Sequence, residues 1–244
     1  MNAMIFAAGL GTRLRPLTND RPKAMVEVAG KPLLQHQIEK LKQAGFDHIV
    51  INIHHFGQQI IDFLSQNDNF GLDIRISDER DLLLDTGGGI RKALSLFDND
   101  DPILIHNVDI ISDIDVKSLY ESHKGIATLA INQRKTSRYL IFNQKMQMQG
   151  WTNIQTGEVK PSSLLDYESN GLLRFAFSGI HIVDKKIAKY LNKREEDVFP
   201  IMDFYISLCQ QEQINGIDMT GHKWVDCGNP EHLDYAKDII CSLQ

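Results

Sequence analysis

The chain has 244 residues with a formal net charge of −6, and 42% of them are apolar. This length and composition supply the core of a single α/β domain, and the acidic balance argues against a nucleic-acid-binding surface, which needs a broad basic face. No apolar stretch approaches the about 18 residues of a membrane span, and the cysteines show no Cys-x-x-Cys spacing. We therefore expect a cytoplasmic protein without a membrane partner, a zinc site or a disulfide framework.

Apolar runs in the first half of the chain predict strands that alternate with helices. Strands are expected over residues 4–6, 48–53, 72–77 and 103–106, and helices over 33–44, 58–63 and 90–97. This βαβ rhythm implies a parallel sheet. The second half turns towards β structure, with strands over 126–131 and 175–183, a hairpin over 139–151 that covers a site, and helices over 200–211 and 230–243.

These elements together predict an α/β fold. We expect a Rossmann-like three-layer αβα sandwich with a mostly parallel central sheet, formed by a single domain over residues 1–244. No internal repeat is found in the sequence.

A glycine-rich turn that carries several cations follows the first strand. It runs Ala7-Ala8-Gly9-Leu10-Gly11-Thr12-Arg13-Leu14, and Pro16-Leu17-Thr18 and Arg21-Pro22-Lys23 come soon after. Gly9 and Gly11 permit positive φ and close approach of the backbone, which favours N–H groups that face phosphate oxygens. Arginine adds a planar fork for phosphate, and lysine adds a compact charge.

Two familiar phosphate-binding templates do not fit this turn. The dinucleotide fingerprint needs a third glycine where this chain has Leu14, and Pro16 prevents a smooth helix. The P-loop needs Gly-Lys-Ser/Thr, whereas Gly11 is followed by Thr12-Arg13. The turn therefore indicates a triphosphate-binding loop of another kind.

Two aspartates are candidate metal ligands. Asp109 comes just after the strand over 103–106, at the kind of sheet edge where α/β proteins bind ligands. Asp226 stands where a short strand leads into the last helix. A nucleotide-bound Mg²⁺ is typically held by one or two carboxylates together with phosphate oxygens and water. A loop aspartate is also commonly a helix cap or a turn former, so the residues alone leave both interpretations open.

These segments together resemble the signature of the sugar-1-phosphate nucleotidyltransferases. In that family the turn is followed by Pro-Leu-Thr and Arg-Pro-Lys, a strand ends in Asn-Gly-Asp, and Trp-x-Asp-x-Gly-Thr-Pro comes later. This chain has Asn107-Val108-Asp109 and Trp224-Val225-Asp226-Cys227-Gly228-Asn229-Pro230, so Val108 replaces a glycine and Asn229 replaces a threonine. The resemblance implies the nucleotide-diphospho-sugar transferase fold, Mg²⁺ on Asp109 and Asp226, and a nucleoside triphosphate and a sugar-1-phosphate as partners.

The resemblance also implies a mechanism of direct displacement. The sugar-1-phosphate oxygen attacks the α-phosphorus of the triphosphate, and pyrophosphate leaves. Arg13 is expected to grip the departing phosphates and Lys23 to stabilise charge at the transferred phosphorus. The residues expected to bind the nucleotide are Ala7, Ala8, Gly9, Gly11, Thr12, Arg13, Lys23, Gly87 and Gly88. The part up to about residue 115 is expected to bind the nucleotide, and residues from about 116 to 244 to bind the sugar and cover the site.

Within the family, Asp85-Thr86-Gly87-Gly88-Gly89-Ile90 and Phe175-Ala176-Phe177-Ser178-Gly179-Ile180 look most like the N-acetylmuramate-1-phosphate uridylyltransferases. This implies UTP and N-acetylmuramate-1-phosphate as substrates, with Gly87 and Gly88 at the base, Asn107 contacting the sugar and Gly179 lining its pocket. Mannose-1-phosphate guanylyltransferases share most of these motifs and are the alternative. A non-catalytic nucleotide-sugar-binding module, a dehydrogenase and a phosphocholine-transferring enzyme remain as further hypotheses.

Overall fold

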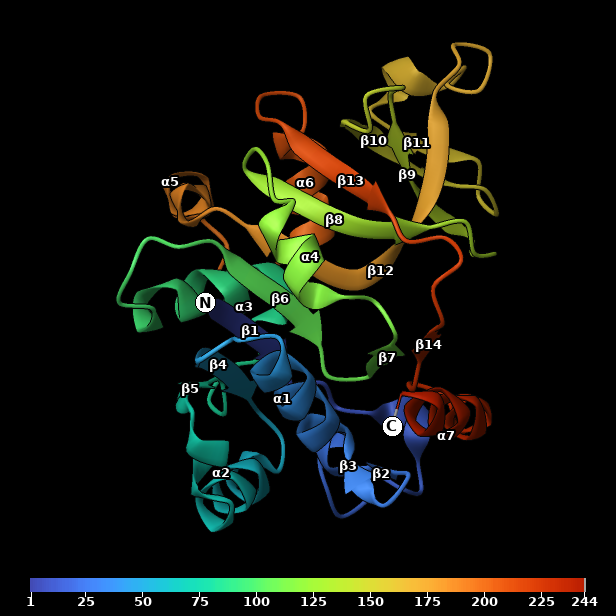
Figure 1. Ribbon diagram of the computed structural model, residues 1–244. Coiled ribbons are helices and arrows are strands. Elements are labelled where there is room, and N and C mark those ends of the chain that lie inside the picture. The colour runs from blue at the N-terminus through green and yellow to red at the C-terminus, as the bar shows by residue number, and fades with distance from the viewer. Residues whose placement is uncertain (244) are drawn as a thin grey trace.

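The computed structural model describes residues 1–243, and the first strand lies in the middle of the main sheet (Figure 1). Strand β1 (Asn2–Phe6) pairs in parallel with β4 (His48–Ile53) on one side and with β6 (Ile103–Asn107) on the other. Strand β5 (Asp73–Asp78) extends the parallel part beyond β4. The parallel sheet that the βαβ rhythm predicts is therefore confirmed.

The second half of the chain continues the same sheet with antiparallel strands. Strand β12 (Leu173–Val183) pairs with β6, β8 (Ala127–Asn132) and β9 (Arg138–Phe142). The predicted hairpin is present, because β9 pairs with β10 (Met148–Asn153), which pairs in turn with β11 (Glu158–Lys160). Strand β13 (Ile214–Asp218), which the sequence patterns did not predict, lies parallel to β8.

Helices cover both faces of the sheet, as expected for three layers (Figure 1). One apolar core is formed with α1 (Leu33–Gln43), α2 (Gly57–Gln66), α4 (Val116–Glu121) and α7 (Leu233–Ser242). The other is formed with α3 (Asp85–Ala93), α5 (Ala188–Leu191) and α6 (Ile201–Leu208). Strand alternation divides β1 between them, since Ala3 and Ile5 join the first core and Met4 joins the second.

Two short ribbons stand outside the main sheet. One pairs β2 (Glu27–Val28) with β3 (Lys31–Pro32). The other pairs β7 (Ile110–Ser112) with β14 (Trp224–Asp226), which lie beside α7 in Figure 1. This second ribbon matters most for function because it carries Asp226 and directly follows Asp109.

The boundaries of one helix differ from the prediction. A helix is expected from residue 90, but α3 begins at Asp85 and contains the three glycines of residues 87–89. Their tertiary packing outweighs the low helix propensity of glycine. Within residues 1–243, no helix has the length and apolar character needed to cross a membrane.

Candidate active site

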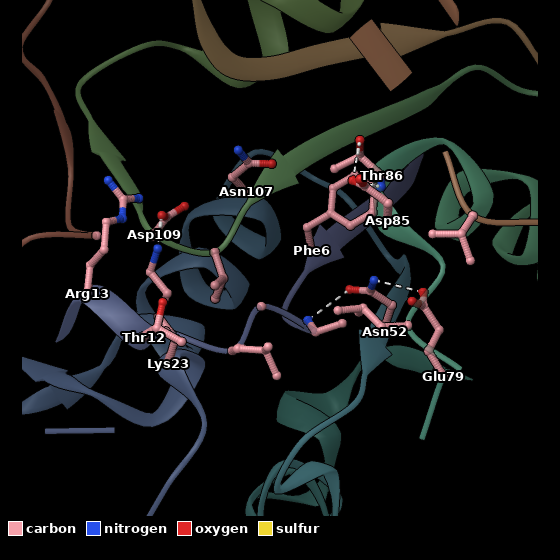
Figure 2. A pocket seen from close by; sticks show the side chains of 18 residues that line it. Phe6, Thr12, Arg13, Lys23, Asn52, Glu79, Asp85, Thr86, Asn107 and Asp109 are labelled. Atoms are coloured by element: carbon pink, nitrogen blue, oxygen red, sulfur yellow. Dashed lines mark hydrogen bonds and ion pairs between the residues drawn. The ribbon is translucent and has the colours of Figure 1, made fainter. Parts of the chain in front are cut away.

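A cavity of about 570 Å³ opens where β1, β4 and β6 reach their carboxyl ends. Eight of the residues predicted as site residues line it, namely Ala8, Gly9, Gly11, Thr12, Arg13, Lys23, Asn107 and Asp109. Figure 2 shows two ends of this cavity. Arg13, Lys23 and Asp109 lie at the charged end, and Asn52, Glu79, Asp85 and Thr86 lie at the polar end.

The glycine-rich turn owes its shape to Gly11 and Thr18. Gly11 has a φ of +63°, and an added Cβ would come within 2.9 Å of the Thr18 methyl carbon. The Thr18 hydroxyl donates a hydrogen bond of 2.8 Å to the Gly11 carbonyl, and the fully buried Leu14 anchors the single 3-10 turn that follows. Thr18, from the Pro-Leu-Thr motif, thus closes the loop, and a side chain at position 11 would open it.

Lys23 and Asp109 form an ion pair at the charged end. The Lys23 ammonium donates to the Asp109 carboxylate, and only 12% and 13% of these two side chains are exposed. Burial raises the pKa of the Asp109 carboxyl, the neighbouring Asp226 charge adds to this rise, and Lys23 opposes it. Asp109 therefore holds a proton or a cation more readily than an exposed aspartate does.

Asp226 lies beside Asp109 because the ribbon places it there. In the β7–β14 register Asp226 is opposite Ile110, and the Cys227 N–H donates to the Asp109 carbonyl at 2.8 Å. Burial opposes ionisation of Asp226, but hydrogen bonds from the Gly228 N–H and from Asp109, together with the Lys23 and Arg13 charges, outweigh it and lower its pKa. Two adjacent carboxyl groups with unequal proton affinity result.

Gly228 allows the guanidinium and the second carboxylate to approach each other. A Cβ at this position would lie 2.6 Å from an Arg13 guanidinium nitrogen and 2.7 Å from an Asp226 oxygen. Gly228 also lines the cavity. Our sequence predictions did not include Gly228 as a site residue, although its place two residues after Asp226 in the Trp-x-Asp-x-Gly motif was a usable signal.

A buried hydrogen-bond network supports the polar end. The Asn52 side-chain oxygen accepts from the Ala7 N–H at 2.8 Å and the Ala8 N–H at 3.3 Å. Its amide nitrogen donates to Glu79 at 2.9 Å, and Glu79 also accepts from the Leu84 N–H at 3.1 Å. Asn52 and Glu79 were missed in the sequence. The available signal was an asparagine inside the otherwise apolar strand over 48–53, since a buried amide requires partners.

Gly87 and Gly88 lie beside the cavity and do not line it. A Cβ on Gly87 would meet the Phe199 ring at 2.3 Å, and one on Gly88 would meet the Asp197 carbonyl at 2.1 Å. The Gly87 N–H donates to the Phe199 carbonyl at 2.8 Å. The structure thus uses both glycines for close packing of α3, while Asp85 and Thr86 just before them face the cavity.

Asn107 and Gly179, which are both expected near the sugar, lie next to each other. Gly179 has a φ of +77°, and its absent Cβ would lie 3.0 Å from the Asn107 amide nitrogen. It lies at an irregularity in the pairing of β12 with β8. The space beside the Asn107 side chain therefore depends on a glycine here.

Other predicted features lie outside this cavity. Arg21, from the Arg-Pro-Lys motif, is exposed and pairs with Asp20. The β9–β10 hairpin lines a second cavity of about 600 Å³ that includes Arg134, Trp151 and Phe177. Asn229, which replaces the family's threonine, accepts a hydrogen bond from the Glu231 N–H and so caps the short 3-10 helix over Pro230–His232.

Comparison with known proteins identifies the family. The family model described as nucleotidyl transferase matches residues 2–241. The N-acetylmuramate alpha-1-phosphate uridylyltransferase of Caulobacter vibrioides is 33% identical, over 94% of this chain and 92% of its own length. The mannose-1-phosphate guanyltransferase of Yarrowia lipolytica is 30% identical over 95% of this chain, which spans 61% of that longer protein.

A solved structure agrees in fold. HddC from Yersinia pseudotuberculosis, complexed with GMP-PN, matches with a TM-score of 0.76 at 22% identity and covers 98% of this chain and 99% of its own.

The chain belongs to the nucleotidyl transferase family. The resemblance drawn from the turn and the two aspartate motifs is thereby confirmed.

Proposed function

We propose that this protein condenses a nucleoside triphosphate with a sugar-1-phosphate and releases pyrophosphate, and that UTP and N-acetylmuramate-1-phosphate are its substrates. The observation that carries the proposal is one continuous cavity with the glycine turn, Arg13, Lys23 and Asp109 at one end and the Asn52–Glu79 network at the other. The C. vibrioides relative supports the choice of substrates.

At the charged end, the chain's own residues provide for phosphate. Backbone N–H groups of the turn and the Arg13 guanidinium bind the leaving β- and γ-phosphates, and Lys23 exchanges its contact with Asp109 for one with the transferred phosphoryl group. A new bond forms between the sugar-phosphate oxygen and the α-phosphorus. The bond from the α-phosphorus to the oxygen that bridges the α- and β-phosphates breaks, and this oxygen leaves with the pyrophosphate. No general base is needed because a phosphate monoester, with a second pKa of about 6, is already anionic at neutral pH.

The donor set fits a divalent cation of the Mg²⁺ type. Two oxygen-bearing side chains, Asp109 and Asp226, lie side by side, and no cluster of three or more His, Cys, Asp or Glu residues suited to a metal is found within residues 1–243. Such a pair matches a cation that takes its other ligands from phosphate and water. When bound, Mg²⁺ would neutralise charge on the reacting phosphates.

The polar end is the place for the nucleobase. Asp85 and Thr86 face the cavity there, and the Thr86 hydroxyl accepts a 2.9 Å bond from the Ile201 N–H, so its orientation is fixed. We assign base recognition to these residues, with Gly87 and Gly88 setting the position of α3. Asn107 and Gly179 then border the sugar.

The test is pyrophosphate release over a grid of triphosphates and sugar-1-phosphates, with Mg²⁺ present and absent. UTP with N-acetylmuramate-1-phosphate is expected to give the highest kcat/KM. Use of GTP with mannose-1-phosphate, and none of UTP, would establish the guanylyltransferase alternative. Binding of a nucleotide sugar without any pyrophosphate release would instead establish the non-catalytic module.

A further inference from the structure

No strand covers the outer edge of β7 in the β7–β14 ribbon, among the residues that the structure describes. The Cys227 N–H donates to the Asp109 carbonyl and the Asp113 N–H donates to the Lys223 carbonyl, so residues 109 and 113 face β14. Bonding direction alternates along an antiparallel strand, which turns the backbone groups of Ile110 and Ser112 away from β14. Within the described residues this ribbon has two strands, and these outward carbonyls therefore need other partners.

Helix α1 supplies those partners from two side chains one turn apart. The Gln37 amide nitrogen donates to the Ile110 carbonyl at 2.7 Å, and Gln37 is 1% exposed. The Lys40 ammonium donates to the Ser112 carbonyl at 2.8 Å and to the Ser112 hydroxyl at 3.1 Å. Because residues i and i+3 share one face of a helix, the two donors match the two-residue spacing of the strand carbonyls.

We propose that Gln37 and Lys40 are positioning residues for the Asp109–Asp226 cation site, because they replace a third strand at the free edge of β7. Asp109 directly precedes the held strand, and Asp226 is opposite its first residue, Ile110. Releasing this edge lets the ribbon move and separates the two carboxylates. Burial lowers the pKa of Lys40 to about 8, and the Asp113 and Asp115 charges oppose this shift. Burying the Lys40 ammonium beside β7 therefore costs free energy. The inference rests on the proposed function.

The test measures Mn²⁺ binding directly, by the electron paramagnetic resonance signal of the free ion, on the full chain with a non-hydrolysable UTP analogue. Gln37→Met and Lys40→Met keep side-chain length and remove the donor. Each is expected to raise the Mn²⁺ dissociation constant about 10-fold or more, the effect usual for outer-shell partners of metal ligands. Saturating Mn²⁺ should restore most of kcat, and Lys40→Arg, which keeps a donor, should recover part of the affinity.

Lys42→Met is the matched control, since Lys42 lies on the same helix, is exposed and contacts the Phe70 carbonyl. It should leave Mn²⁺ affinity unchanged. If the Met variants fail to fold, Gln37→Asn and Lys40→Gln, which have shorter polar side chains, are tested for the same rise in the Mn²⁺ dissociation constant. Lower melting temperatures with wild-type Mn²⁺ affinity would overturn the inference and leave the proposed function intact. A wild type that takes up no Mn²⁺ would overturn both.

Discussion

Two buried histidines make the stability of this fold sensitive to acid. His106 on β6 is 0% exposed and His181 on β12 is 2% exposed. Burial lowers the pKa of each to about 3, and the Lys40 charge adds to the effect on His106. His106 Nδ1 lies 2.8 Å from the Asn107 carbonyl, while neither nitrogen of His181 has a hydrogen-bond partner among residues 1–243. Both imidazoles are therefore neutral in the folded protein.

The sign and size of the effect follow from these values. Because the folded-state pKa of about 3 is below the unfolded value of about 6.5, the unfolded chain takes up protons first as the pH falls. The stabilising contribution is complete above pH 6.5 and is lost as the pH falls towards 3. At pH 5 each histidine lowers the free energy of unfolding by RT ln(1 + 10^1.5), about 2 kcal/mol. The two lie on opposite faces of the sheet, so about 4 kcal/mol is expected in total.

Urea unfolding at pH 7.5 and pH 5.0 measures this loss of unfolding free energy. Histidine variants separate it from the part that surface carboxylates contribute. His181→Phe keeps a ring against Tyr205, whose centroid is 5.7 Å from that of His181, and removes the titrating group. It should lose about 2 kcal/mol less than the wild type between the two pH values. His55→Gln changes an exposed side chain and should behave as the wild type. Equal losses in wild type and His181→Phe would refute the reasoning.

Further predictions concern the site. Asp109→Asn and Asp226→Asn should still fold, because both carboxylates lie at strand ends and contribute ligands and not core packing, yet lose turnover about 100-fold or more, as rate and thermal assays will show. Lys23→Ala should lower kcat, because its charge acts at the transferred phosphorus. Arg13→Ala should raise the KM for the triphosphate by about 10–100-fold and should also slow the reverse reaction with pyrophosphate. An unaffected reverse reaction would contradict the role of Arg13. Gly9→Ala places a methyl group with no atom within 4 Å, so it should fold normally and weaken only nucleotide binding, measured by titration.

Local sequence patterns predicted the central strands well because these strands are buried runs of apolar residues. The strand over 48–53 was predicted with the bounds that β4 has. Strand β13 was missed because Gly216 interrupts its alternation. That glycine is required by packing, since a Cβ there would meet Ile131 at 2.6 Å and Phe142 at 2.7 Å. A contact between distant segments, which local propensity does not contain, therefore decided this strand.

The candidate site divides in the same way. The glycine turn, Lys23 and both aspartates belong to contiguous motifs, so the sequence pointed to them directly, and the cavity gathers most of them. Asn52 lies on β4 and Glu79 directly follows β5, so the two meet only when those strands pair. Residues that act by holding other residues leave little signal in a single sequence.

The charged end of the cavity is completed by the C-terminal part of the chain. Asp109 follows β6 in the middle of the sheet, whereas Asp226 arrives on β14 just before α7, the last helix. The fully buried Cys227 and the α7 residues Ala236 and Ile239 join the same apolar core as α1. The second carboxylate therefore reaches the first only when the C-terminal helix is docked. Cation binding at this pair should then report on completion of the fold, because an undocked α7 leaves Asp109 with Lys23 alone.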